Sequence, residues 1–145
     1  MNKLIQFKKY TFKNLHIVLL VLTVLLIPIG LINERIWIRK MLERPKYTVA
    51  TATTDWHQKN NNGVGTDYQY EINHEVYSST TNFSYKKGDR FLIIFDSIKP
   101  KNSKVLDIYP VGADYIGLKI SKNGWKYHEV PFYIDSNKIK KYLED

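Results

Sequence analysis

The chain has 145 residues, no cysteine and a formal net charge of +8. Without cysteine it can form no disulfide, no thiolate metal site and no cysteine nucleophile. Residues 1–46 hold nine basic and two acidic residues, so the other 13 basic and 12 acidic residues leave the rest of the chain nearly neutral. A nucleic-acid-binding domain carries its basic excess on the folded part, which argues against nucleic acid as a partner.

The first element is an uncharged run of twenty residues, 14–33. As a helix it would measure about 30 Å, the thickness of the hydrocarbon core of a bilayer. A cleaved leader is the first alternative, but the run is long for one and no small-x-small site follows it. A core helix is the second, but a chain of this size has too small a core. We therefore expect an uncleaved, single-pass transmembrane helix with the lipid bilayer as a partner, and these anchoring residues: Leu15, Val18, Leu22, Leu25, Pro28, Leu31 and Trp37.

Basic residues flank this run on both sides, four in residues 1–13 and five in residues 35–46. A short lysine-rich tail before a first span is typical of a signal anchor with a cytoplasmic N-terminus. Export of that tail would also move four charges against the membrane potential. We expect residues 1–13 to be a cytoplasmic tail, the anchor to lie in the inner (cytoplasmic) membrane, and the following domain to be periplasmic or extracellular. The helix could continue beyond the apolar run to residue 44. It should end there, because Pro45 disfavours helical conformation in the residue before it.

From Tyr47 onward, β-branched and aromatic residues alternate with turn residues, a composition typical of strands. The predicted fold class is mainly β: the transmembrane helix is followed by a small antiparallel β barrel or sandwich over residues 47–135. The tail 136–145 has apolar residues at helical spacing and is expected to be a short helix or an irregular tail. The expected strands are residues 47–58, 67–72, 75–81, 90–95 and 104–109, with a further hairpin of residues 115–120 and 125–130 around Asn123-Gly124.

Two of these strands have the clearest pattern. Tyr68, Tyr70 and Ile72 alternate with polar residues, which places them on one face. The next dipeptide, Asn73-His74, suits a two-residue turn, and the resulting hairpin would pair Tyr70 with Tyr77. Residues 90–95, "RFLIIF", form a continuous apolar run and are the best candidate for a central strand.

The stretch from residue 47 to about residue 110 resembles a bacterial family known as domain of unknown function 3592. The similarity consists of a Tyr-x-Tyr hairpin, a Gly-Asp turn, an apolar strand and a loop with Pro and Asn-Ser. His74 stands where that family has a hairpin glycine, and Ser97-Ile98 stands at the start of the loop. The resemblance implies a membrane-tethered β module without catalytic residues. The matching residues are Tyr68, Tyr70, Ile72, Asn73, Tyr77, Gly88, Asp89, the strand 91–95, Pro100, Asn102 and Ser103.

No catalytic pattern stands out. The glycines at 63 and 65 lack the Gly-Lys-Ser/Thr that completes a phosphate loop, and there is no His-Glu-x-x-His. Asp55 and His57 would share a face of a strand as an acid/base or ligand pair, but an exposed polar face explains them equally well. We therefore expect no enzyme activity, no catalytic residues, no cofactor and no metal.

The aromatic content is high, with 11 Tyr, 6 Phe and 3 Trp. Such residues fill β cores, and they also carry much of the energy at protein interfaces. The expected function is that of a membrane-anchored accessory or scaffold subunit that binds an envelope protein. The alternative is a membrane-tethered immunity protein that neutralises a toxin. The candidate partner-binding residues are Trp56, Tyr68, Tyr70, Tyr77 and Trp125.

Overall fold

The computed structural model describes residues 13–59, 63–112, 115 and 117–144, without the side chains of residues 27–29, 31 and 59. It divides into two compact units, one up to Trp37 and one from Ile38 onward. The first unit contains most of helix α2 (Leu15–Glu43), and the second contains the last turns of α2, the strands and the remaining helices. Most of the predicted tail 1–13 lies outside the described residues.

Helix α2 corrects the predicted transmembrane span. None of the helices in the described part of the chain meets the length and apolarity required to span a membrane. Among the described side chains, the apolar run extends from Leu15 to Leu26, about 18 Å of helix. From Glu34 onward the helix contains charged residues, and it ends at Glu43. Arg44 then connects it to the first strand, which begins at Pro45. The prediction of a transmembrane helix over residues 14–33 is therefore wrong.

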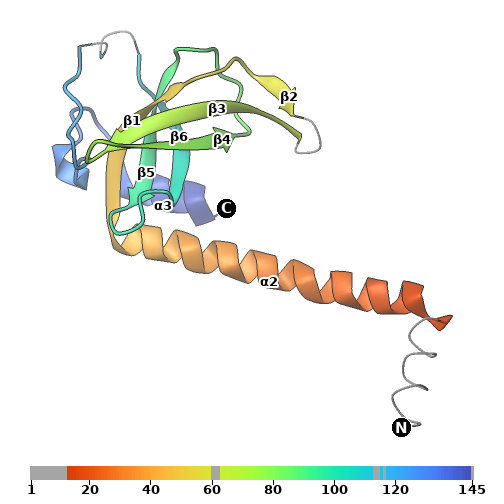
Figure 1. Ribbon diagram of the computed structural model, residues 1–145. Coiled ribbons are helices and arrows are strands. Elements are labelled where there is room, and N and C mark those ends of the chain that lie inside the picture. The colour runs from red at the N-terminus through yellow and green to blue at the C-terminus, as the bar shows by residue number, and fades with distance from the viewer. Residues whose placement is uncertain (1–12, 60–62, 113–114, 116, 145) are drawn as a thin grey trace. The chain divides into compact units, whose positions relative to one another are not determined.

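The second unit is built on one antiparallel sheet (Figure 1). The strand order is β2-β3-β1-β5-β6, and β4 pairs with β3. The predicted barrel or sandwich is thus also wrong, because the described strands form a single sheet in which β4 and β6 are not joined. The strands are β1 (Pro45–Ala52), β2 (His57–Lys59), β3 (Gly63–Ile72), β4 (Glu75–Thr81), β5 (Arg90–Asp96) and β6 (Ser103–Pro110).

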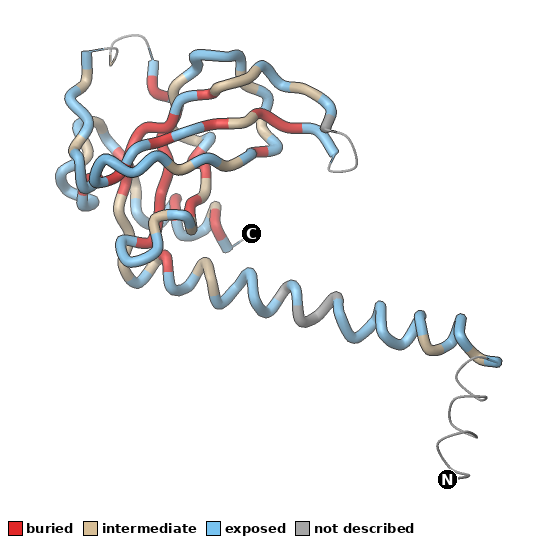
Figure 2. Tube along the Cα trace, viewed as in Figure 1, coloured by how far each residue is buried: buried red, intermediate tan, exposed pale blue. Residues whose placement is uncertain are grey.

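β5 is an interior strand of the sheet, as its apolar run predicted, and pairs with β1 on one side and with the edge strand β6 on the other. Its side chains alternate between two hydrophobic clusters. Leu92 and Ile94 pack with the end of α2 and with α3 (Ser136–Glu144), whereas Phe91, Ile93 and Phe95 pack with β3. Figure 2 shows buried residues along these strands, while most of α2 is exposed. Because both faces of the sheet are covered, β5 has no polar alternation.

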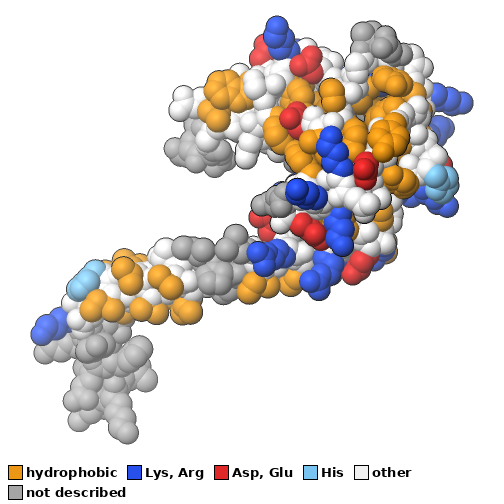
Figure 3. Space-filling model, turned by 180° about the vertical axis from the view of Figure 1, so that it is seen from behind, with side chains coloured by type: hydrophobic (Ala, Val, Ile, Leu, Met, Phe, Trp, Pro, Cys, Tyr) orange, Lys and Arg blue, Asp and Glu red, His pale blue; other side chains and the backbone are white. Residues whose placement is uncertain are grey.

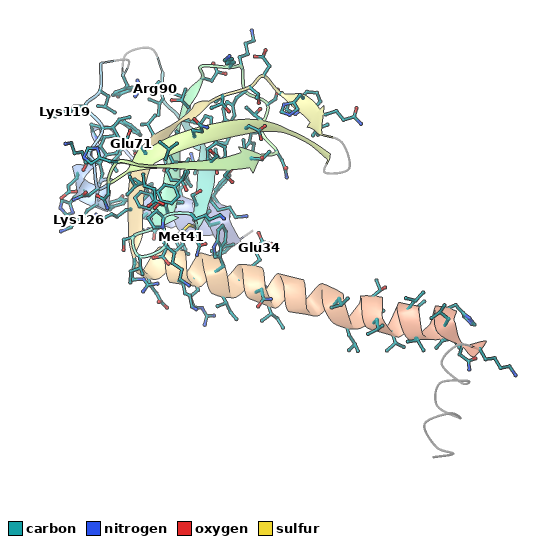
Figure 4. All side chains as sticks on the ribbon, in the orientation of Figure 1. Glu34, Met41, Glu71, Arg90, Lys119 and Lys126 are labelled. Carbon is teal, nitrogen blue, oxygen red and sulfur yellow. The ribbon has the colours of Figure 1, made fainter. Side chains whose placement is uncertain are left out.

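Met41 connects the end of α2 to the first of these clusters. Its side chain is completely buried and points from α2 toward the strands (Figure 4). Ile38 and Leu42 pack beside it, and α3 contributes Ile139 and Leu143 from the other side. The last turns of α2 are thus part of the folded β unit.

The hairpin of β3 and β4 confirms the predicted alternation and turn. Tyr68, Tyr70 and Ile72 are all buried, and Tyr70 pairs directly with Tyr77. Their rings stack with centroids 5.5 Å apart. Asn73 and His74 have φ values of 54° and 67°, the left-handed pair that a type I′ turn requires.

Replacing His74 with glycine should stabilise the protein by about 1 kcal/mol, because a residue with a Cβ is strained at positive φ. The change removes a 3.5 Å contact between His74 and Glu71, but both side chains are exposed and such pairs contribute little. Urea denaturation of His74→Gly and wild type measures the difference. A stability equal to or below that of wild type would show that the turn is not strained.

The predicted hairpin of residues 115–120 and 125–130 is wrong. Around Asn123-Gly124 the chain turns without strands, and it then forms a short 3-10 helix η2 (Tyr127–Glu129). The turn instead brings Trp125 beside β1. The N–H of Tyr47 donates to the carbonyl of Trp125 at 2.9 Å, and the N–H of Trp125 donates to the carbonyl of Tyr47 at 2.7 Å. β3 pairs with β1 only near its end, at Thr51 and Ala52. The 122–125 segment therefore covers the part of the β1 edge that β3 leaves unpaired.

Candidate protein-binding surfaces

The structure places the five predicted partner-binding residues in different environments. Tyr68, Tyr70 and Trp125 are buried within the two hydrophobic clusters, at 2%, 5% and 7% exposure. Tyr77 is half-buried, and Trp56 is exposed at 45%. Core packing therefore accounts for three of the five residues, and only Trp56 and Tyr77 are accessible to a partner.

The buried tyrosines hold the sheet in a curled shape. Tyr70 donates a 2.7 Å hydrogen bond to the backbone oxygen of Pro100, and the hydroxyl of Tyr68 lies 3.4 Å from that of Ser103. Pro100 and Ser103 come just before and at the start of β6, which is separated from β3 in the sheet by β1 and β5. These contacts require the sheet to bend so that β3 faces the start of β6, and they satisfy hydroxyl groups that would be costly to bury alone.

Burial raises the pKa of Tyr47 and of Tyr70 from 10.0 to about 12. A group whose pKa is higher in the folded state contributes stability below its unfolded pKa, and that stability is lost as the pH rises through the folded value. We therefore expect the protein to lose stability between about pH 10 and pH 12. Urea denaturation across this range tests the expectation, with Tyr70→Phe as the comparison. The loss should be smaller in Tyr70→Phe, and an equal loss in both proteins would contradict the assignment.

Trp56 lies beside two half-buried aromatic residues, Phe83 and Tyr85, that pack against the second hydrophobic cluster. The backbone N–H of Trp56 donates to the carbonyl of Tyr85 at 3.0 Å. The buried hydroxyl of Thr66 donates to the carbonyl of Phe83 and accepts from the N–H of Tyr85, which fixes that loop. The ring of Tyr85 stacks on Phe91 with centroids 4.2 Å apart. Phe83 and Tyr85 were not among the predicted site residues, although their i, i+2 spacing resembles that of Tyr68 and Tyr70.

Tyr85 also donates a 2.5 Å hydrogen bond to Asp107 on β6. Burial and this hydrogen bond raise the pKa of the Tyr85 phenol. Tyr142, which lies nearby on α3, has its pKa raised chiefly by burial. Both phenols therefore stay protonated at neutral pH, and Tyr85 acts as a hydrogen-bond donor rather than as a base or nucleophile.

The predicted pair of Asp55 and His57 does not form. Asp55 accepts a hydrogen bond from the N–H of Lys87 at 2.8 Å, whereas His57 contacts the backbone oxygen of Asp55 and lies 3.8 Å from the carboxylate of Asp67. Within the described residues, no group of three or more His, Asp or Glu side chains is placed to hold a metal ion.

In the part of the chain that the structure describes, most of the exposed large hydrophobic residues lie on α2. Nine large hydrophobic residues between Leu15 and Leu26 are exposed at 48–65%. They occupy consecutive turns and all sides of the helix, and Figure 3 shows hydrophobic side chains over the N-terminal part of α2. We call this the apolar α2 surface, made of Leu15, Ile17, Leu19, Leu20, Val21, Leu22, Val24, Leu25 and Leu26.

The predicted anchor residues overlap with this surface. Leu15, Leu22 and Leu25 are exposed, and Val18 and Trp37 are half-buried. The side chains of Pro28 and Leu31 lie outside the described part of the structure. The sequence thus correctly indicated an apolar helix at these residues, but the prediction that this helix spans a membrane is wrong.

No family model, curated protein or solved structure matches this chain. The resemblance to domain of unknown function 3592 therefore stays a prediction.

Proposed function

We propose that this chain is a non-enzymatic accessory or scaffold subunit that binds a protein partner through the apolar α2 surface. The supporting observation is the exposure of nine large hydrophobic residues between Leu15 and Leu26. Proteins rarely expose contiguous apolar surface of this extent unless it is an interaction site. A helix that is apolar on all sides is normally buried in a larger structure.

The chemistry of the partner follows from this surface. Between Leu15 and Leu26 the only polar side chains are His16 and Thr23, and Thr23 donates to the backbone oxygen of Leu19 at 2.9 Å. The segment thus offers almost no hydrogen bonds to a partner. Apolar helices of another protein are the complementary surface, because they can bury this segment without leaving polar groups of the partner buried and without hydrogen bonds.

The absence of enzyme activity is part of the proposal. The phenols of Tyr85 and Tyr142 have raised pKa values, which is the opposite of the shift that activates a nucleophile. The side chains of Asp55 and His57 have separate backbone partners. Neither group of residues supports catalysis, and Met41 contributes only to the packing of the β unit.

Photo-cross-linking tests the proposal. A photo-reactive benzoylphenylalanine is placed at Leu20, which is 65% exposed on α2, and at Tyr133, an 83% exposed control on the β unit. On irradiation in the native cells, Leu20 should give a protein adduct of one defined mass that the control does not give. No adduct at Leu20, or the same adducts from both positions, would contradict the proposal.

The identity of the adduct also decides between the two roles expected from the sequence. A structural or assembly protein supports the scaffold role. A nuclease or pore-forming toxin would instead support the alternative, neutralisation of a toxin. We favour the scaffold role, because the apolar α2 surface lacks the polar and charged groups that give toxin inhibitors their specificity.

A further inference from the structure

Strand β4 forms an outer edge of the sheet (Figure 1). Its seven residues pair with β3 in an unbroken register, from Thr66↔Thr81 to Ile72↔Glu75. Natural sheets protect such an edge with lysine, proline, bulges or a covering element. β4, "EVYSSTT", has neither lysine nor proline, and its only charged residue is Glu75.

The two-residue turn determines which backbone groups face outward. It makes Ile72 and Glu75 a hydrogen-bonded pair, and such pairs alternate along an antiparallel ladder. Tyr77 therefore bonds to β3, whereas Val76 and Ser78 direct their N–H and C=O groups away from it. In the part of the chain that the structure describes, neither residue makes a further backbone hydrogen bond.

We propose that this edge pairs with the same edge of a second copy of this chain, antiparallel and with the two Tyr77 residues facing each other at the two-fold axis. Val76 of each copy then lies opposite Ser78 of the other, and the two pairs form four backbone hydrogen bonds. The contact is isologous, so it closes as a dimer and does not propagate. The proposal is independent of α2 and goes beyond the proposed function.

Three observations favour this register. Tyr77 is half-buried and stacks on Tyr70 with an interplanar angle of 16°, so pairing at Tyr77 continues the row of rings into the second copy. Thr80 is already engaged by a 2.6 Å hydrogen bond to Asp67, and this register leaves it outside the new ladder. The side chain of Val76 is 60% exposed in the single chain, and the strand of the second copy would bury part of it.

The charges are also compatible. In this register Glu75 lies opposite Ser79 of the second copy, so no like charges face each other. The two Glu75 residues are offset by four positions, which corresponds to about 14 Å along the strands. That separation exceeds the Debye length of about 8 Å at physiological ionic strength. The only charged residue of β4 therefore does not oppose this register.

Single-cysteine cross-linking tests the register, because the full chain has no cysteine of its own. Residues that face each other in a non-hydrogen-bonded pair are close enough for a disulfide. Tyr77→Cys should give at least tenfold more disulfide-linked dimer on oxidation than Ser79→Cys, whose copies are about 14 Å apart. Equal cross-linking of the two variants, or none at Tyr77→Cys, would overturn the register.

A proline variant tests the dimer without altering Tyr77. The N–H of Ser78 faces outward, so Ser78→Pro keeps the β3–β4 ladder and blocks the outer edge. Sedimentation of the full chain should show the mass of the Ser78→Pro assembly falling to half that of wild type, with an unchanged circular dichroism spectrum. An unchanged mass would overturn the proposal, as would the cross-linking of β4 to a different protein. The α2 cross-link at Leu20 does not depend on either result.

Discussion

Replacing Asp96 with alanine should lower the free energy of unfolding by about 3 kcal/mol. Asp96 is 1% exposed at the end of β5 and accepts a 3.1 Å hydrogen bond from the guanidinium of Arg44. Its other carboxylate oxygen accepts from the N–H of Ile98 at 2.9 Å. The alanine variant removes both acceptors and leaves the Arg44 charge and the Ile98 N–H without them. Urea denaturation of the full chain measures the loss.

Two further variants show whether the ion pair causes this loss. Asp96→Asn keeps an acceptor for Ile98 and should lose less stability than Asp96→Ala. A double-mutant cycle with Arg44→Ala should show that the two single losses are not additive. Additive losses would mean that Arg44 and Asp96 stabilise the fold independently. The ion pair would then not contribute to the contact between the end of α2 and the end of β5.

Gly124→Ala should cost about 3 kcal/mol, from left-handed backbone strain and overpacking together. Gly124 has a φ of 71°, and a Cβ there would lie 2.6 Å from the ring of Phe95 and 3.1 Å from the backbone oxygen of Tyr47. The backbone of the 122–125 segment can approach β1 this closely only because residue 124 has no side chain.

Gly88→Ala is the matched control for this prediction. Gly88 has a φ of 93°, but a Cβ there would meet no described atom within 4 Å. The Gly88→Ala variant should therefore lose only the free energy that backbone strain costs, about 1 kcal/mol. Thermal denaturation of both variants gives the comparison, and equal losses would show that the contact with Phe95 is not limiting.

Local patterns in the sequence predicted the centre of the sheet. The alternation of Tyr68, Tyr70 and Ile72 and the turn at Asn73-His74 depend on residues that are adjacent in the chain. The apolar run of β5 likewise reports burial on both faces of the strand. These features follow from local stereochemistry and periodicity, and the structure has them at the expected residues.

Features that depend on distant contacts were not predictable in this way. Asn123-Gly124 is a strong hairpin signal, but its glycine is used for packing against Phe95 and β1. Aromatic content alone did not separate core residues from surface residues: Tyr68 and Trp56 were both candidate interface residues, but Tyr68 is buried and Trp56 is exposed. The apolar run at 14–33 predicted a transmembrane helix that could continue to residue 44. The structure has a helix that ends at Glu43, but nothing in the sequence indicated that Met41 would pack in the core of the β unit.

Quantitative affinity purification from the native cells tests most directly whether α2 binds the partner. Wild type is compared with Leu20→Asp and Leu22→Asp, which place a charge on the apolar α2 surface, and with Tyr133→Asp, an equally drastic change on the β unit. The proposed function predicts a partner in stoichiometric amount with wild type and Tyr133→Asp, and its loss with both α2 variants. Retention of the same partner by Leu20→Asp and Leu22→Asp would contradict it.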